Sequence, residues 1–315
     1  MDTPAGNPSS VMPALSFPIC PRILPIRQSS MLRRWNDYHA LHSFRGRSFS
    51  LQKPARTVRV LALGGSSTWG YRIPAESGGD YPAQLERRLN TPNGNHASRA
   101  SVQVINGAFV GATGTRLYHL LRDSLADFSP DIVTLSLTFN DSSSCTLGDE
   151  DGYYDMISAP GYERSWWQDW KLSRDYARAQ TTLKTLVTEV RGKDPRSTTE
   201  LWSALGMTTS PPERFAAILR RFAELARERH FQLVLIKEPV VGPQRLIWKD
   251  EFYAAIDQVA AEYQLPVVDP AAALADAGGD SLFMDTVHPT REGNKVIADE
   301  LEKALRPLLA RCRRR

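Results

Sequence analysis

A serine placed directly after two glycines is the residue of this sequence best suited to nucleophilic chemistry. Ser66 stands in Ala62-Leu-Gly-Gly-Ser-Ser-Thr-Trp-Gly70, just behind an apolar, β-branched run. A serine hydroxyl attacks a carbonyl carbon efficiently only when a base takes its proton and hydrogen-bond donors stabilise the oxyanion. The rest of the chain must therefore supply a base and convergent donors.

An acid and an imidazole three residues apart supply the base. Asp285 and His288 stand in Asp285-Thr-Val-His288-Pro289, ahead of the last helical stretch. A carboxylate can hold an imidazole in the tautomer that accepts a proton from serine. Such a pair alone more often combines a helix-start carboxylate with a surface histidine, so its weight comes from the other motifs. We predict Ser66, His288 and Asp285 as nucleophile, base and orienting acid.

Two further segments offer donors for an oxyanion. Gly111 lies in a Gly-rich stretch after one apolar run, and Asn140 in Thr138-Phe-Asn140-Asp141 after the next. The Gly111 backbone N–H and the Asn140 amide would both lie at the sheet edge that carries Ser66, and an oxyanion hole needs convergent donors of this kind. Asp141 could simply close an Asx-type turn.

The elements that must position these residues alternate between strands and amphipathic helices. This alternation predicts an α/β fold, a three-layer α/β/α sandwich around a parallel sheet of about five strands, with the chemistry at the carboxyl ends of the strands. The expected strands cover residues 58–63, 102–106, 131–137, 231–236 and 265–269, and the expected helices 81–89, 115–128, 212–230, 251–263 and 291–309.

The four ordered motifs resemble those of the SGNH, or GDSL, hydrolase family. The resemblance runs from about Val58 to the last helix and implies a flavodoxin-like fold and ester cleavage through an acyl-enzyme, with no metal or organic cofactor. It implies the triad of Ser66, Asp285 and His288, and an oxyanion hole formed by the Ser66 N–H, Gly111 and Asn140.

Two positions depart from the family pattern. Gly65 stands where Asp is usual, giving Gly-Gly-Ser-Ser-Thr, and Thr138 stands where Gly often precedes the Asn motif. Neither change removes a predicted catalytic group, but both alter the floor of the site. The elbow of the α/β-hydrolases is disfavoured, because Thr68 occupies the place of its second Gly and Asp285 lies too near the histidine.

The same motifs leave other functions open. An O-acyltransferase or a carbohydrate O-deacetylase would use the same acyl-enzyme, and a non-catalytic carbohydrate-binding relative is a further alternative. The expected substrate is a small-molecule or carbohydrate ester, and the sequence does not specify its acyl chain or its alcohol.

The outer parts of the chain suggest one hydrolase domain with two additions. Residues 1–33 are expected to form an irregular extension, and residues 34–315 a single domain with an aromatic-rich insertion at about 148–210. This insertion could form a lid or pocket wall, or a small satellite core. The candidate pocket residues are Trp69, Trp166, Trp167 and Trp170.

Composition excludes several other classes. Of the 315 residues, 42% are hydrophobic and 23% are charged, as in globular proteins. The net charge is +4, and much of the positive excess lies in the basic ends of the chain, which does not indicate nucleic-acid binding. No apolar run is long enough to span a bilayer, and the prolines near the start do not fit a signal peptide. The three cysteines do not suggest the disulfides of an exported protein, so a cytoplasmic location is expected. Asp37, His39 and His42 are not assigned a metal, and His119 and His230 are expected to be partly exposed helix residues.

Overall fold

The computed structural model describes residues 44–45, 47–91, 101–143, 145–146, 208–209, 212–241 and 249–312. The predicted extension at 1–33, the histidines near position 40, and Trp166, Trp167 and Trp170 of the predicted insertion lie outside these residues.

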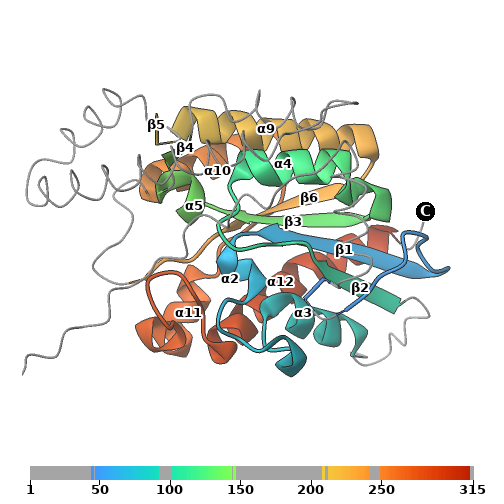
Figure 1. The fold of residues 1–315 in the computed structure, drawn as a ribbon, viewed down its shortest axis with the longest axis horizontal. Helices are drawn as coiled ribbons and strands as arrows, with labels where there is room; N and C mark the ends of the chain where they lie inside the picture. The colour runs from blue at the N-terminus through green and yellow to red at the C-terminus, as the bar shows by residue number, and fades with distance from the viewer. Residues whose placement is uncertain are drawn as a thin grey trace, which may run out of the picture.

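A five-stranded parallel sheet forms the centre of the molecule (Figure 1). Its spatial order is β2-β1-β3-β6-β7, and the predicted parallel sheet of about five strands is confirmed. The central strands are short apolar runs with buried residues throughout, because helices cover both faces of a parallel sheet. The strands are β1 (Thr57–Gly64), β2 (Ser101–Asn106), β3 (Ile132–Leu137), β6 (Gln232–Lys237) and β7 (Val267–Val268).

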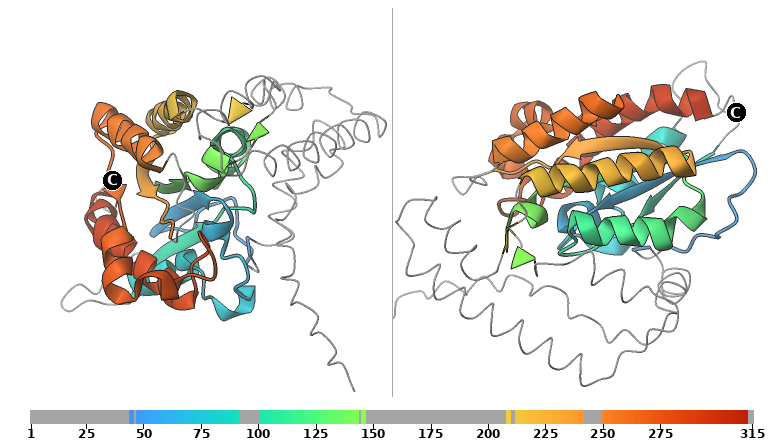
Figure 2. Two further views of the ribbon diagram at one scale, coloured as in Figure 1. Left: turned by 90° about the vertical axis from the view of Figure 1, so that its left-hand side faces the viewer. Right: turned by 90° about the horizontal axis from the view of Figure 1, so that it is seen from above.

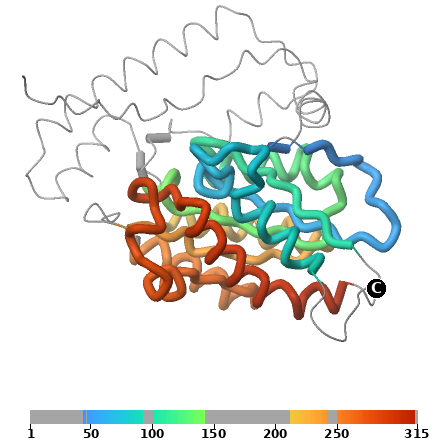
Figure 3. The backbone as a smooth tube through the Cα atoms, turned by 90° about the horizontal axis from the view of Figure 1, so that it is seen from below, coloured from blue at the N-terminus to red at the C-terminus, as the bar shows by residue number. Residues whose placement is uncertain are grey.

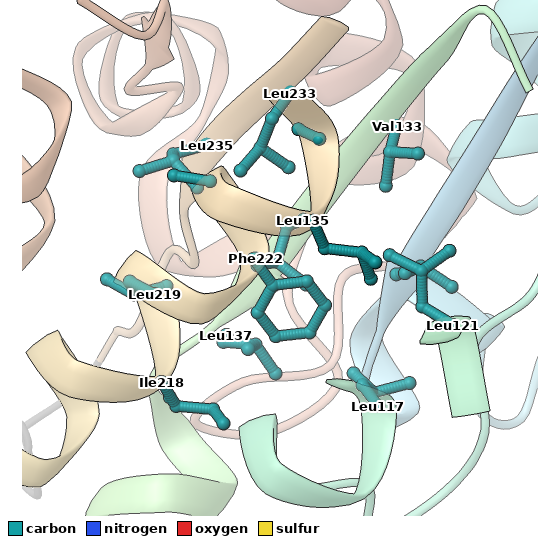
Figure 4. Packing of buried hydrophobic residues seen from close by; sticks show 14 of the residues in the cluster. Leu117, Leu121, Val133, Leu135, Leu137, Ile218, Leu219, Phe222, Leu233 and Leu235 are labelled. Atoms are coloured by element: carbon teal, nitrogen blue, oxygen red, sulfur yellow. The ribbon is translucent and has the colours of Figure 1, made fainter. Parts of the chain in front are cut away.

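One helical layer covers the upper face of the sheet in Figure 1. It consists of α4 (Gly114–Asp123), α9 (Pro212–Arg229) and α10 (Lys249–Tyr263). Phe222 of α9 is fully buried between the sheet and α4, and Figure 4 shows it among the leucines of β3, β6 and α4. The helical spacing of apolar residues predicted this stripe, and their burial is the main favourable contribution to folding.

The second helical layer lies below the sheet. It contains α3 (Tyr81–Asn90), α11 (Ala271–Ala277) and α12 (Arg291–Cys312), and the left-hand view in Figure 2 shows the sheet between the layers. Figure 3 shows the red C-terminal helix α12 beside α3. The Tyr81 N–H donates to Asn294 Oδ1 at 2.9 Å, which fixes the start of α3 against the start of α12. No helix in the described part of the chain is both long enough and apolar enough to cross a bilayer.

The strand register brings the ends of the middle strands to one edge. Gly64 at the end of β1 pairs with Ser136 of β3, and Leu137 pairs with Lys237 of β6. The segments that follow these strands therefore meet at the left-hand edge in Figure 1, where the short helices α2 (Ser66–Trp69) and α5 (Phe139–Ser143) lie.

The structure corrects two predictions about α4. The expected helix over 115–128 ends at Asp123 and a separate 3-10 turn covers Leu125–Phe128, because Ser124 leaves helical geometry with φ −150° and ψ −61°. His119 is buried and not partly exposed, since α4 packs against both the sheet and α9. His230 is exposed but lies just past the end of α9, with φ 60°.

Short elements that the sequence did not predict flank the expected insertion. Cys145 and Thr146 form β4, which pairs antiparallel with Thr208 and Thr209 of β5. This two-stranded ladder brings together the chain positions on either side of residues 147–207. The sequence between them therefore leaves and re-enters the described fold at adjacent points.

Candidate active site

The turn from β1 into α2 places Ser66 at the sheet edge. Gly64 allows a tight approach, because an added Cβ would overlap the side chain of Thr68. Ser66 begins α2, and its carbonyl accepts hydrogen bonds from the Gly70 and Tyr71 N–H groups at 3.0 Å each. The Ser66 backbone is thus held at the start of a short helix.

The structure brings Ser66, His288 and Asp285 into one hydrogen-bonded chain. Ser66 Oγ lies 2.7 Å from His288 Nε2, and His288 Nδ1 lies 2.8 Å from both carboxylate oxygens of Asp285. The Tyr71 ring packs on the imidazole at a centroid distance of 4.8 Å. With Asp285 on Nδ1, the neutral imidazole presents an acceptor at Nε2, and this geometry allows proton transfer from the serine.

The loop before α12 organises the carboxylate itself. Asp285 Oδ1 accepts the backbone N–H groups of Val287 at 3.1 Å and His288 at 2.9 Å. Burial raises the pKa of Asp285, but the hydrogen bonds from the His288 ring and these two N–H groups outweigh it and hold the pKa below its usual value. The Asp285 carboxyl group therefore stays ionised to lower pH than an ordinary Asp side chain.

The two predicted oxyanion donors lie on neighbouring loops. Gly111 lies half-buried between β2 and α4 with φ 74°, and the carbonyl of the next residue, Ala112, accepts the Asn140 Nδ2 hydrogen at 2.9 Å. This bond uses one of the two N–H groups of the Asn140 amide. Asp141 does more than close a turn: both its oxygens accept the Gly114 N–H, which ties α5 to the start of α4.

A buried carboxyl that the sequence analysis did not single out lies at the same edge. Glu238 directly follows β6 and accepts hydrogen bonds from Ser67 Oγ and, at 2.8 Å, from the Phe139 N–H. Burial raises its pKa, and hydrogen bonds from Ser67 and from the backbone of Phe139 and Thr138, together with the charge of His288, oppose that rise. An acidic residue at the carboxyl end of a buried strand was the available signal, because such positions face the site in α/β sheets.

A second buried network supports α2 from below. Asp80 caps α3 by accepting the Ala83 N–H and pairs with Arg45 Nε at 3.1 Å. Asn106 Nδ2 donates to the Thr68 carbonyl at 3.1 Å and approaches Asp80. Trp69, the one predicted pocket residue that is described, is half-buried with the Arg45 guanidinium 5.3 Å from its ring. Its described contact is thus with this supporting network.

Comparison with known proteins agrees with this architecture. A family model described as GDSL-like Lipase/Acylhydrolase family matches residues 62–296. No curated protein matches the sequence.

Three solved structures are similar to this chain. A variant of Axe2, an acetyl xylan esterase from Geobacillus stearothermophilus, is 15% identical with a TM-score of 0.51, covering 79% of this chain and 94% of that one. A protein described as a GDSL-like lipase from Parabacteroides merdae is 15% identical with a TM-score of 0.50, covering 78% and 94%. A protein described as lipolytic and of the G-D-S-L family, from Desulfitobacterium hafniense, is 18% identical with a TM-score of 0.47, covering 79% and 99%.

Proposed function

Because this chain belongs to the GDSL-like lipase/acylhydrolase family, we propose that it cleaves carboxylic esters through an acyl-enzyme on Ser66. The single observation that carries the proposal is the hydrogen-bonded chain from Ser66 Oγ through His288 to Asp285. Family membership supports ester hydrolysis in general, and the geometry supports the particular residues.

In the first half-reaction the ester acylates the serine. His288 Nε2 takes the proton of Ser66 Oγ as the oxygen bonds to the ester carbonyl carbon, and Asp285 stabilises the imidazolium that forms. The Ser66 N–H, the Gly111 N–H and the second N–H of the Asn140 amide stabilise the oxyanion. The tetrahedral intermediate then breaks its bond to the alcohol oxygen, which receives the proton from His288.

In the second half-reaction water releases the acyl group. His288 removes a proton from the water as its oxygen attacks the acyl carbon, and the same imidazole returns that proton to Ser66 Oγ. The products are the carboxylic acid and the free enzyme. Transfer of the acyl group to a second alcohol would follow the same steps with that alcohol in place of water.

The test compares wild type with Ser66→Ala on aryl esters of graded acyl length and on acetylated sugars. Ser101→Ala is the matched control, because Ser101 lies at the start of β2, at the opposite edge of the sheet. We expect Ser66→Ala to lose hydrolysis and fluorophosphonate labelling, while Ser101→Ala keeps both. Full hydrolysis by Ser66→Ala would overturn the proposal, and added acceptor alcohol would reveal any transfer in the product ratio.

A further inference from the structure

Glu238 is a buried carboxyl that the proposed reaction does not use. Glu238 directly follows Lys237, the last residue of β6, and it is only 3% exposed. A buried ionisable group is costly unless it is hydrogen-bonded, so such a group needs a compensating role. Lys237, the preceding residue, turns outward to Asp257, and it does not neutralise Glu238 through any ion pair described for the structure.

Hydrogen bonds to the Glu238 carboxyl group join the segments that carry the proposed chemistry. Oε1 accepts the hydroxyl of Ser67, the residue after the proposed nucleophile. Oε2 accepts the N–H of Phe139, the residue before Asn140. One carboxyl thus connects the end of β6 to the turn after β1 and the turn after β3. Through these contacts Glu238 fixes Ser66 relative to Asn140.

Burial favours the neutral form of Glu238, and the hydrogen bonds donated to its carboxyl group oppose this effect. The Phe139 N–H can only donate, and the Tyr253 hydroxyl from α10 donates to the Glu238 backbone carbonyl. Among the residues that the structure describes, the titratable groups that interact with it electrostatically are Tyr253, Tyr81 from α3 and His288 from the loop before α12. Of these, only His288 gains positive charge during the proposed reaction. A negative charge on Glu238 would therefore stabilise the imidazolium.

We propose that Glu238 is a positioning residue of this site, which aligns Ser66 with Asn140 through Ser67 and Phe139 and stabilises protonated His288 by its charge. The inference rests on the proposed function and deepens it. It attributes two separable effects to one side chain: a geometric effect through hydrogen bonds and an electrostatic effect through the carboxylate.

Two variants separate these effects. Glu238→Gln removes the charge while keeping similar size and hydrogen-bonding atoms, whereas Ser67→Ala removes one hydrogen bond and keeps the charge. Asp131→Asn is the matched control, because Asp131 is also a hydrogen-bonded carboxylate, paired with Lys53 at 2.7 Å, but lies before β3 at the opposite sheet edge.

For Glu238→Gln we expect kcat to fall about tenfold with KM changed by less than about threefold, since the loss is felt mainly in the transition state. The acid limb of the pH profile of kcat/KM should move to lower pH by about half a unit or more, because the imidazolium loses a favourable charge. Ser67→Ala should lower kcat about fivefold without moving that limb. Asp131→Asn should change neither quantity.

An acid limb of Glu238→Gln that coincides with that of wild type would overturn the inference, as would a kcat of Ser67→Ala within about twofold of wild type. If Glu238→Gln does not fold, the kcat of Ser67→Ala alone tests the inference by the same criterion. Fluorophosphonate labelling of wild-type Ser66 separates the two proposals. Without labelling both proposals fail, whereas labelling together with a wild-type pH profile in Glu238→Gln removes only the role of Glu238.

Discussion

The Asn140 amide occupies the space that a side chain at position 65 would need: a Cβ added to Gly65 would lie 2.5 Å from Asn140 Nδ2. Real Cβ atoms do not approach a nitrogen so closely. Because the same amide donates to Ala112, it cannot move away without losing that bond. The glycine at position 65 is therefore matched to the position of Asn140, and a larger residue here would displace a proposed oxyanion donor.

Gly65→Ala should lower kcat for ester hydrolysis about tenfold to a hundredfold, because loss of one oxyanion donor typically has an effect of this order or larger. The backbone of Gly65 has φ −84°, so the expected loss comes from the contact and not from backbone strain. A double-mutant cycle with Asn140→Ala checks the cause. If Gly65→Ala reduces kcat equally in the wild type and in Asn140→Ala, the explanation through Asn140 is wrong.

Asp285→Asn should lower kcat by about three to four orders of magnitude while leaving the fold intact. The Asn amide has only one acceptor oxygen and no negative charge. It therefore no longer orients the His288 ring in the same way, and it does not stabilise the imidazolium. Steady-state kinetics with circular dichroism of both proteins provides the check. Retention of a tenth or more of the wild-type kcat would contradict the assigned role.

The lowered pKa of Asp285 also predicts a pH-dependent contribution to stability. A carboxylate whose pKa is lower in the folded than in the unfolded state stabilises the fold above its ordinary pKa of 3.8, and this contribution is lost as the pH falls towards the folded value. The unfolding free energies of wild type and Asp285→Asn should thus differ more at about pH 7 than at about pH 3. Urea unfolding at both values measures this difference, and an equal or larger gap at low pH would refute it.

Arg45 and Arg47 make ion pairs that should differ in their contribution to the free energy of unfolding. Arg45 and Asp80 have side chains only 6% and 4% exposed, whereas Arg47 is 47% exposed beside Glu86. Arg45→Met leaves a buried carboxylate without its cation and should cost about 3 to 5 kcal/mol in unfolding free energy. Arg47→Met, the control, should cost less than about 1 kcal/mol. Chemical denaturation measures the unfolding free energy of both variants. Similar losses in the two variants would show that burial does not determine the contribution of the Arg45–Asp80 pair.

Much of the sheet could be predicted because its signal is local. The apolar, β-branched run at 58–63 lies within β1, and the run at 131–137 begins one residue before β3 and ends with it. The break in α4 could not be predicted in this way, since Leu117, Leu121 and Leu125 keep helical spacing across the non-helical Ser124. Periodicity records which face is buried and is insensitive to a single residue that leaves helical geometry.

The site shows the same division between local and distant signals. Ser66, Asp285 and His288 stand in short motifs, and the structure brings all three together. Glu238 escaped prediction because a charged residue before a proline resembles the start of an exposed loop. Its burial results from three strand ends meeting, which is a property of the assembled sheet and not of the sequence around position 238.

The proposed nucleophile comes from the first strand of the sheet, whereas its base directly precedes the final helix, and α12 is held against α3 by the Tyr81–Asn294 bond. A growing polypeptide on the ribosome would thus carry Ser66 long before it carries His288. We expect the nascent chain to stay inert towards esters until α12 has emerged and docked. Hydrolytic activity would then report that α12 has been synthesised and has docked against α3.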